Sequence, residues 1–436
     1  MNAGQRAATL VAGFVLCAAR AGAQQSSDST IRRQQRTLDS LTSALRALAA
    51  RQDSLAAQPQ AAPVARASGA YMNIGFSGLS DAGWSSEPNV GSLQGGDHDP
   101  KVRGFTIPNA ELALDGNVDP YFKGFVNIVH KLDAHGETGV ELEEMFTVTT
   151  SLPANLQAKA GQFFTEFGRQ NNQHPHAWSF IDQPLVMNRM FGPEGLRSQG
   201  VRVSWLLPTA HYAEAMVSVL NSDAGATASF ISDESSEIHG GVPVDHGVNG
   251  PRDMLYVPRF ATSFDPTETQ TVLLGVSGAF GPNNSGPSAT TRIFGADLYW
   301  KWKSARAFQG FPFFSWQTEA MMRRYGASAR DAAGVANVTL PAEELRDQGV
   351  YSQFLWGIKP RIVAGLRGEV VNGERSLFAP VLADRYRISP NLTWYPTEFS
   401  KLRLQYNYDH REGLGDDHSL WLQFEFIMGA HAAHKF

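Results

Sequence analysis

The chain has 436 residues, a formal net charge of -5 and 18% charged residues. It has no long run of Lys or Arg, so we expect no nucleic-acid partner. After the first residues, no stretch reaches about 18 consecutive apolar residues, which excludes a helical membrane protein. The single cysteine, Cys17, excludes a cysteine-based nucleophile or metal site once the first residues are removed.

The N-terminus predicts a secretion signal peptide over residues 1–23. Arg6 supplies its positive region, residues 10–16 its apolar core and Ala21–Ala23 a cleavage site of small residues. Residues 28–58 then carry apolar side chains at a period of 3.5, which predicts a coiled coil in the periplasm. The other interpretation is a lone amphipathic helix. A Pro/Ala-rich stretch, 59–69, follows as a linker.

From residue 70 to 436 the period of the pattern becomes two. In 402–409, for example, Leu402 and Leu404 alternate with Arg403 and Gln405. Runs of about ten such residues predict strands that cross a bilayer, in an antiparallel barrel of about sixteen strands, although fourteen or eighteen are also compatible. The expected strands are 70–80, 104–115, 120–131, 139–151, 155–167, 198–207, 211–221, 255–264, 269–280, 291–303, 311–325, 348–359, 361–371, 384–395, 400–410 and 418–436.

Connections between these strands alternate between short turns and long polar segments. This alternation is typical of Gram-negative outer-membrane barrels, whose turns face the periplasm and whose loops face outward. The expected long loops are 81–103, 168–197, 222–254, 326–347 and 372–383. The chain ends in Phe436, on the lipid-facing side of the last strand. A terminal aromatic residue of this kind looks like a signal for the barrel assembly machinery.

Four segments carry a resemblance to the phosphate-selective porin O and P family: Gly104–Leu112, Gly161–Arg169, Phe180–Pro184 and Phe191–Gly200. The resemblance implies a homotrimer of sixteen-stranded barrels in which the third long loop, here 168–197, folds inward. This loop contains three arginines and no lysine. The C-terminal residues 428–436 also resemble barrels labelled zinc-regulated TonB-dependent outer membrane receptors.

The constriction candidates of loop 168–197 are Arg169, Arg189, Glu194 and Arg197. In the alternative, the loop only packs against the barrel wall. Basic residues outnumber acidic residues on the polar face of the strands, which predicts an anion preference; the alternative is a mixed lumen without selectivity. The basic candidates are Lys123, Lys159, Arg202, Lys301, Lys303, Arg323, Arg361, Arg367, Arg385, Arg387 and Arg403. The acidic residues are Asp297, Glu319, Glu369 and Glu425.

Two histidine pairs are zinc candidates, His174 with His176 and His431 with His434. No compact set of three or four ligands accompanies them, so structural or solvated histidines are the favoured interpretation and no cofactor is expected. The sequence has no Gly-x-Ser-x-Gly, Walker loop or His-Glu-x-x-His motif, so we expect no enzyme.

Three functions fit the sequence. The first is a trimeric porin for passive diffusion of small hydrophilic solutes. The second is a TonB-dependent or zinc-regulated receptor for metal uptake. That class needs a plug and about 22 strands, and residues 70–436 are too few to supply both. The third is a structural barrel that tethers the outer membrane to peptidoglycan. Each places the chain in the outer membrane, in contact with lipid and lipopolysaccharide.

Overall fold

The computed structural model describes residues 71–132, 137–232, 236–244, 247–374 and 383–429. The expected signal peptide, coiled coil and linker lie outside these residues, as do His431, His434 and Phe436. In the described part of the chain, no helix is long and apolar enough to cross a membrane.

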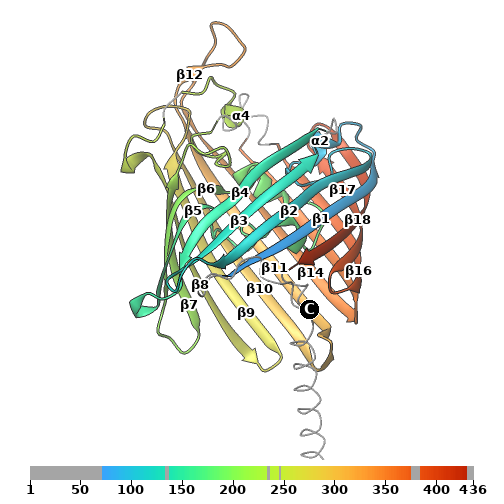
Figure 1. Cartoon of the computed structure of the whole chain (residues 1–436). Coiled ribbons are helices and arrows are strands. Elements are labelled where there is room, and N and C mark those ends of the chain that lie inside the picture. Colours follow the sequence, from blue (N-terminus) through green and yellow to red (C-terminus); the bar gives the residue numbers. More distant parts are fainter. Residues whose placement is uncertain (1–70, 133–136, 233–235, 245–246, 375–382, 430–436) are drawn as a thin grey trace, which may run out of the picture. The chain divides into compact units, whose positions relative to one another are not determined.

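Sixteen antiparallel strands close into a barrel, in which β1 pairs with β18 as well as with β2 (Figure 1). The predicted count is therefore confirmed, and closure leaves no sheet edge exposed to lipid. The strands are β1 (Tyr71–Ser85), β2 (Gly104–Asn117), β3 (Phe122–Leu132), β4 (Thr138–Thr149), β5 (Leu156–Phe164), β6 (Arg197–Leu206), β7 (Tyr212–Asn221), β8 (Met254–Thr267), β9 (Gln270–Pro282), β10 (Thr290–Phe308), β11 (Phe311–Ala327), β14 (Glu343–Lys359), β15 (Ile362–Gly373), β16 (Arg385–Thr397), β17 (Ser400–Arg411) and β18 (Gly415–Gly429).

The observed strands extend beyond the expected ends at some long loops and also at the turn after β10, which ends at Phe308 rather than 303. β1 extends to Ser85 rather than 80, and β14 begins at Glu343 rather than 348. The expected loop 326–347 contains a further two-stranded sheet of β12 (Arg330–Asp331) and β13 (Thr339–Leu340). Polar residues continue the ladder beyond the apolar band, and a hydrophobic pattern does not detect them.

The two faces of the barrel wall have opposite chemistry. On β17 and β18, Leu404 and Leu422 are 47% and 45% exposed on the outer face, whereas Arg403 and Gln405 are 1% and 0% exposed inside. Lipid solvates the outer apolar face and polar groups satisfy one another inside, as in transmembrane barrels. The predicted alternation is thus confirmed on these strands.

Short turns connect the strands at the lower end of the barrel in Figure 1, and the longer connections lie at the upper end with β12 and α4 (Ser236–His239). The connection from β5 to β6, residues 165–196, is named the inner loop. It contains the 3-10 turn η2 (Pro175–Ala177) and the helix α3 (Leu185–Phe191). The remaining described elements are two further 3-10 turns, η1 (Pro153–Asn155) and η4 (Pro251–Asp253), and the helix α2 (Val90–Leu93).

An apolar core lies inside the barrel, where residues of the helix α3 pack against the wall. Met187, Met190 and Phe191 are at most 1% exposed and pack with Met321 of β11 and Tyr351 of β14. A porin lumen is usually polar. This core therefore shows that one side of the lumen is filled by the inner loop rather than by water.

Candidate functional site: the inner loop and the lumen

The inner loop crosses the barrel from wall to wall. Glu319 of β11 accepts hydrogen bonds from the backbone N–H groups of Arg169 and Gln170, at 3.0 and 2.8 Å. His174 contacts Glu144 of β4, with 2.9 Å between Nε2 and Oε2. Six strands separate β4 from β11 one way round the barrel and eight the other way, so these contacts lie on opposite walls. The expectation of an inward-folded loop at 168–197 matches the geometry.

A β-bulge provides the first anchor of the inner loop. The β3–β4 register jumps at Glu143, so Glu143 and Glu144 both turn inward although they are consecutive. His174 lies between them, with its Nδ1 2.9 Å from Glu143 and its Nε2 2.9 Å from Glu144. Burial alone would lower the pKa of His174, but the carboxylates of Glu143 and Glu111 raise it well above its usual value. The imidazolium thus links the loop to β4.

The predicted zinc candidates His174 and His176 are held by carboxylates. His176 Nδ1 lies 3.0 Å from Glu111 of β2, and its ring stacks on that of His174 with the ring planes 11° apart. This arrangement agrees with the interpretation that the two histidines have a structural role. These two histidines are not among the described residues whose ligand atoms converge closely enough for one metal ion.

One other group does bring three potential ligands together: Asp97, His98 and Glu194. However, the ammonium of Lys131 already contacts Asp97 and lies 2.9 Å from Glu194. A bound cation would have to displace this lysine, so the group is a salt-bridge cluster. Burial and the charge of Asp97 raise the pKa of Glu194 to about 7.

Asp182 provides the second anchor and is the most highly coordinated side chain of the loop. Its Oδ1 accepts from Arg367 at 2.5 Å, and its Oδ2 from Arg387 at 2.7 Å. Gln405 and Asn407 each donate a further hydrogen bond at 2.8 Å. Burial alone would raise the pKa of Asp182, but the two guanidinium groups hold it well below its usual range. The loop is thereby tied to β15, β16 and β17.

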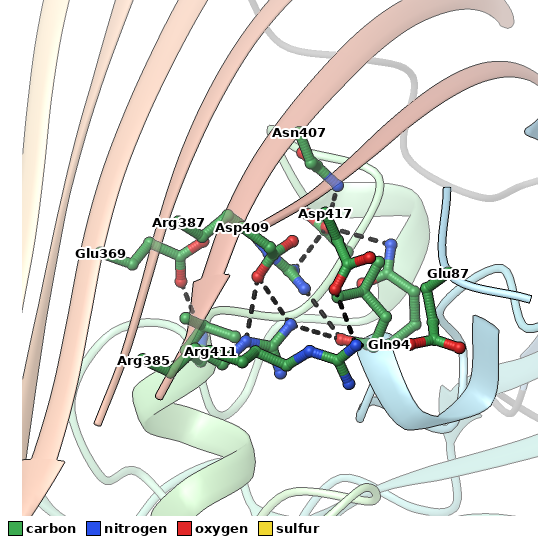
Figure 2. Close-up of polar contacts among 12 residues, drawn as sticks. Glu87, Gln94, Glu369, Arg385, Arg387, Asn407, Asp409, Arg411 and Asp417 are labelled. Carbon is green, nitrogen blue, oxygen red and sulfur yellow. Dashed lines mark hydrogen bonds and ion pairs between the residues drawn. The ribbon is translucent and has the colours of Figure 1, made fainter. Parts of the chain in front are cut away.

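Further arginines of β16 and β17 form ion pairs with neighbouring carboxylates (Figure 2). Arg385 and Arg387 of β16 both bind Asp409 of β17, at 2.7 and 2.9 Å. Arg411 binds Asp417 of β18 at 2.7 Å and Glu87 of the first long loop at 2.6 Å. Arginine is suited to such sites because its planar fork binds carboxylates at two points. These arginines connect loops to the wall.

Most basic candidates that the sequence assigned to the pore have carboxylate partners instead. Lys159 and Arg202 share Glu166, at 2.7 and 2.5 Å. Arg323 binds Asp347, at 2.7 Å, and Arg189 lies 3.7 Å from the same carboxylate. The complete set with such partners is Lys159, Arg189, Arg197, Arg202, Arg323, Arg367, Arg385 and Arg387. Glu194 is likewise held by Lys131 and Arg197. The ion pairs largely cancel the positive charge of these basic residues.

Three basic residues form a contrasting group, the cationic strip: Arg169, Lys301 and Lys303. No carboxylate lies within ion-pair distance of them in the described residues, and Lys301 experiences the repulsion of both others. The Arg169 guanidinium lies over the Tyr299 ring at 4.0 Å and donates to Gln317 at 3.1 Å. Arg169 and Lys301 are half-buried and Lys303 is exposed. Lys301 and Lys303 share the inward parity of Asp297 on β10, so their positive charge lies on the lumen side of the wall.

The remaining basic candidates have three different positions. Lys123 is exposed near the turn end of β3. Arg403 is 1% exposed and donates to the carbonyl of Trp178 in the inner loop, at 2.8 Å. Arg361 corrects the expectation of a lumen position: it lies in the turn between β14 and β15, with φ 72°. The expected turn at Pro360 is correct, but the expected strand 361–371 begins one residue too early, because β15 starts at Ile362.

Several anchoring residues were not singled out from the sequence. Glu143 and Glu144 were detectable as two consecutive acids that break the period of two, which is the signal of a bulge. Asp182 lies in the quoted segment Phe180–Pro184, but its partners are about 200 positions away in the chain, so no local pattern identifies its role. Lys401, which binds Glu425 at 2.6 Å, was also missed.

No family model matches the chain. An outer membrane channel, DcaP of Acinetobacter baumannii, is 14% identical with a TM-score of 0.54, over 84% of this chain and 100% of DcaP. An anion-selective porin from Comamonas acidovorans is 8% identical with a TM-score of 0.51, over 82% and 100% of the two chains. At these identities the likeness shows the fold, which is that of outer-membrane porins.

A sequence relative comes from Aquifex aeolicus (strain VF5) and is described as an uncharacterized protein. It is 31% identical over 362 residues, which make up 77% of this chain and 70% of the relative. The chain therefore belongs to the same family as this Aquifex aeolicus protein, and it has the fold of an outer-membrane porin.

Proposed function

We propose that the chain is an outer-membrane channel through which small hydrophilic solutes diffuse passively, with a preference for anions. The observation that carries this proposal is the cationic strip in a lumen that the inner loop narrows. Partner carboxylates cancel the charge of most other inner basic residues, so the strip dominates the field that a solute meets. Phosphate, as suggested by the sequence resemblance, is the narrower form of this proposal.

The test is the conductance of the purified protein in a planar bilayer, under a KCl gradient. A steady conductance with a reversal potential that favours chloride supports the proposal. Addition of phosphate tests the narrower form, because a bound phosphate would reduce the chloride current. Absence of conductance from folded protein would overturn the channel function.

The alternatives fare differently. A TonB-dependent receptor is expected to have about 22 strands and a plug domain inside, whereas this barrel has sixteen strands and a lumen occupied by its own loops. A structural tether to peptidoglycan through residues 28–58 is compatible with the same barrel. It gains weight only if the folded protein does not conduct.

The arrangement of the whole protein is part of the same proposal. Residues 1–23 are the signal peptide, 28–58 a periplasmic coiled coil and 59–69 a linker. The coiled coil and the family resemblance both favour a homotrimer. Phe436 is proposed to engage the barrel assembly machinery. Mass measurement of the purified protein tests the trimer, and deletion of residues 28–58 tests what the coiled coil contributes to it.

A further inference from the structure

The outer face of the barrel carries a row of three arginines on neighbouring strands, the arginine row. Arg292 of β10 is the cross-strand partner of Arg324 of β11, and Arg324 that of Arg346 of β14. All three are exposed. The next residues along two of these strands, Ile293 and Arg323, point inside and are at most 2% exposed. The three guanidinium groups therefore project from the outer wall side by side.

Such a row is electrostatically unfavourable by itself. Side chains of directly paired residues lie about 5 Å apart, and like charges at that distance destabilise a sheet. Glu344 binds Arg346 at 2.8 Å, and Glu374 acts on Arg346 from a greater distance. Among the described residues, these two exposed carboxylates face three guanidinium groups, which leaves the row with a net positive charge.

An apolar groove begins next to the arginine row on the same outer face. It has a volume of about 470 Å³ and lies on β10, β11, β14 and β15. Phe294 and Met322, the next outward residues after Arg292 and Arg324 along their strands, begin it. The groove lies where the cross-strand partners Ala296 and Ala320 have small side chains. Val350 and Val370 border it.

A second row, of aromatic residues on the same strands, indicates how deep in the membrane the arginine row lies. Trp302, Phe314 and Trp356 are also cross-strand partners, and each lies ten residues along its strand from an arginine of the row. At roughly 3.3 Å per residue and a tilt of about 40°, ten residues span about 25 Å. This equals the apolar band of a transmembrane barrel. The aromatic row lies at the turn end, so the arginine row lies at the headgroup level of the outer leaflet.

We propose that this wall binds a phosphorylated lipid of the outer leaflet, with a phosphate on the arginine row and an acyl chain in the groove. The inference rests on the outer-membrane location but not on channel activity. A two-fold contact between copies would place two arginine rows against each other, and a contact within the proposed trimer is distinguished from lipid binding by the test below. A phosphate supplies two anionic charges and acceptor oxygens to adjacent guanidinium groups.

The test is native mass spectrometry of the detergent-purified protein with defined probes: diphosphoryl lipid A, the same lipid without phosphates, and inorganic phosphate. The row variant is Arg292→Gln/Arg324→Gln/Arg346→Gln. The control variant Arg252→Gln/Arg306→Gln/Lys359→Gln removes the same charge at exposed positions outside the row and groove. Ala320→Phe fills the groove and leaves every charge in place. Altered gel mobility after heating identifies folded barrels for each variant.

We expect the wild type and the control variant to retain diphosphoryl lipid A, and the row variant to bind it at least tenfold more weakly. Ala320→Phe should also weaken it, and the lipid without phosphates should not be retained. The proposal is overturned if the row variant binds like the wild type, or if the control variant loses as much. It is also overturned if inorganic phosphate displaces the lipid while Ala320→Phe has no effect. A changed oligomeric state without changed lipid binding would make the row an interface between copies. Bilayer conductance is recorded separately, so loss of the channel function would not affect this result.

Discussion

The two sides of the lumen use basic residues in opposite ways. On β15, β16 and β17, Arg367 and Arg387 are each 1% exposed and bound to Asp182 of the inner loop. On β10, Lys301 and Lys303 have no carboxylate at ion-pair distance within the described residues and stand near Arg169. The same residue types thus hold a loop on one side and lack a carboxylate partner on the other. A charge count along the strands cannot separate these roles, because it ignores the loop that supplies the counter-charges.

The largest effect is expected at the paired side. Asp182→Ala leaves Arg367 and Arg387 buried without this carboxylate, and removing one partner of a buried ion pair costs roughly 3–5 kcal/mol. We expect a lower thermal unfolding temperature and a larger, noisier single-channel conductance, because the loop detaches from β15–β17. Glu268→Gln, at an exposed turn position, is the control and should change neither. Unaltered stability and conductance in Asp182→Ala would contradict the anchoring role.

The next effect concerns the start of the inner loop. Gly168 has φ 63°, and a Cβ there would lie 1.9 Å from Glu319 Oε2. Gly168→Ala should displace Glu319 from the N–H groups of Arg169 and Gln170, at a cost of roughly 1–3 kcal/mol. Gly413→Ala is the matched control, with φ 77° and nothing near its Cβ position. Denaturant unfolding of both variants isolates the clash: equal losses would mean that the Glu319 contact does not matter.

His98 of the first long loop contacts Glu143, which also holds His174 of the inner loop, and this contact predicts a pH effect. Burial would lower the pKa of His98, but Glu143, 3.4 Å away, and Asp97 raise it to about 9. A raised folded pKa contributes stability that is complete below the unfolded value of about 6.5 and is lost as pH rises through about 9. We therefore expect conductance noise to increase reversibly between pH 7 and 10. His98→Gln should flatten this pH profile. An identical profile in the variant would count against a role of the contact between His98 and Glu143.

The smallest effect on stability, but a clear effect on selectivity, is expected at the strip. Lys301→Gln/Lys303→Gln removes two repelling charges, so stability should change by less than about 0.5 kcal/mol. The reversal potential in a KCl gradient should move toward zero, because less positive charge faces the ions. Arg252→Gln/Lys359→Gln carries the same change of net charge at exposed positions away from the strip. An equal shift in that variant would mean that overall charge, not the strip, sets selectivity.

The barrel was largely predictable and its interior was not, for a physical reason. Lipid imposes a period of two on each strand, so sixteen strands could be counted from local residues alone. Charge pairing inside depends on register and on the path of the inner loop, which bring Asp182 to Gln405 across 223 positions. The bulge at Glu143 and the turn at Arg361 break the alternation and therefore change which side chains point inward.

The central claim is that the cationic strip faces the solute path past the inner loop. The barrel contains no cysteine, since Cys17 is the only one in the chain. Lys303→Cys can therefore be labelled selectively with a bulky, negatively charged methanethiosulfonate reagent during a bilayer recording. Val276→Cys, on the outer face, is the control. We predict stepwise loss of current and of chloride preference for Lys303→Cys alone. Unchanged current in Lys303→Cys that mass spectrometry shows to be fully labelled would contradict the account.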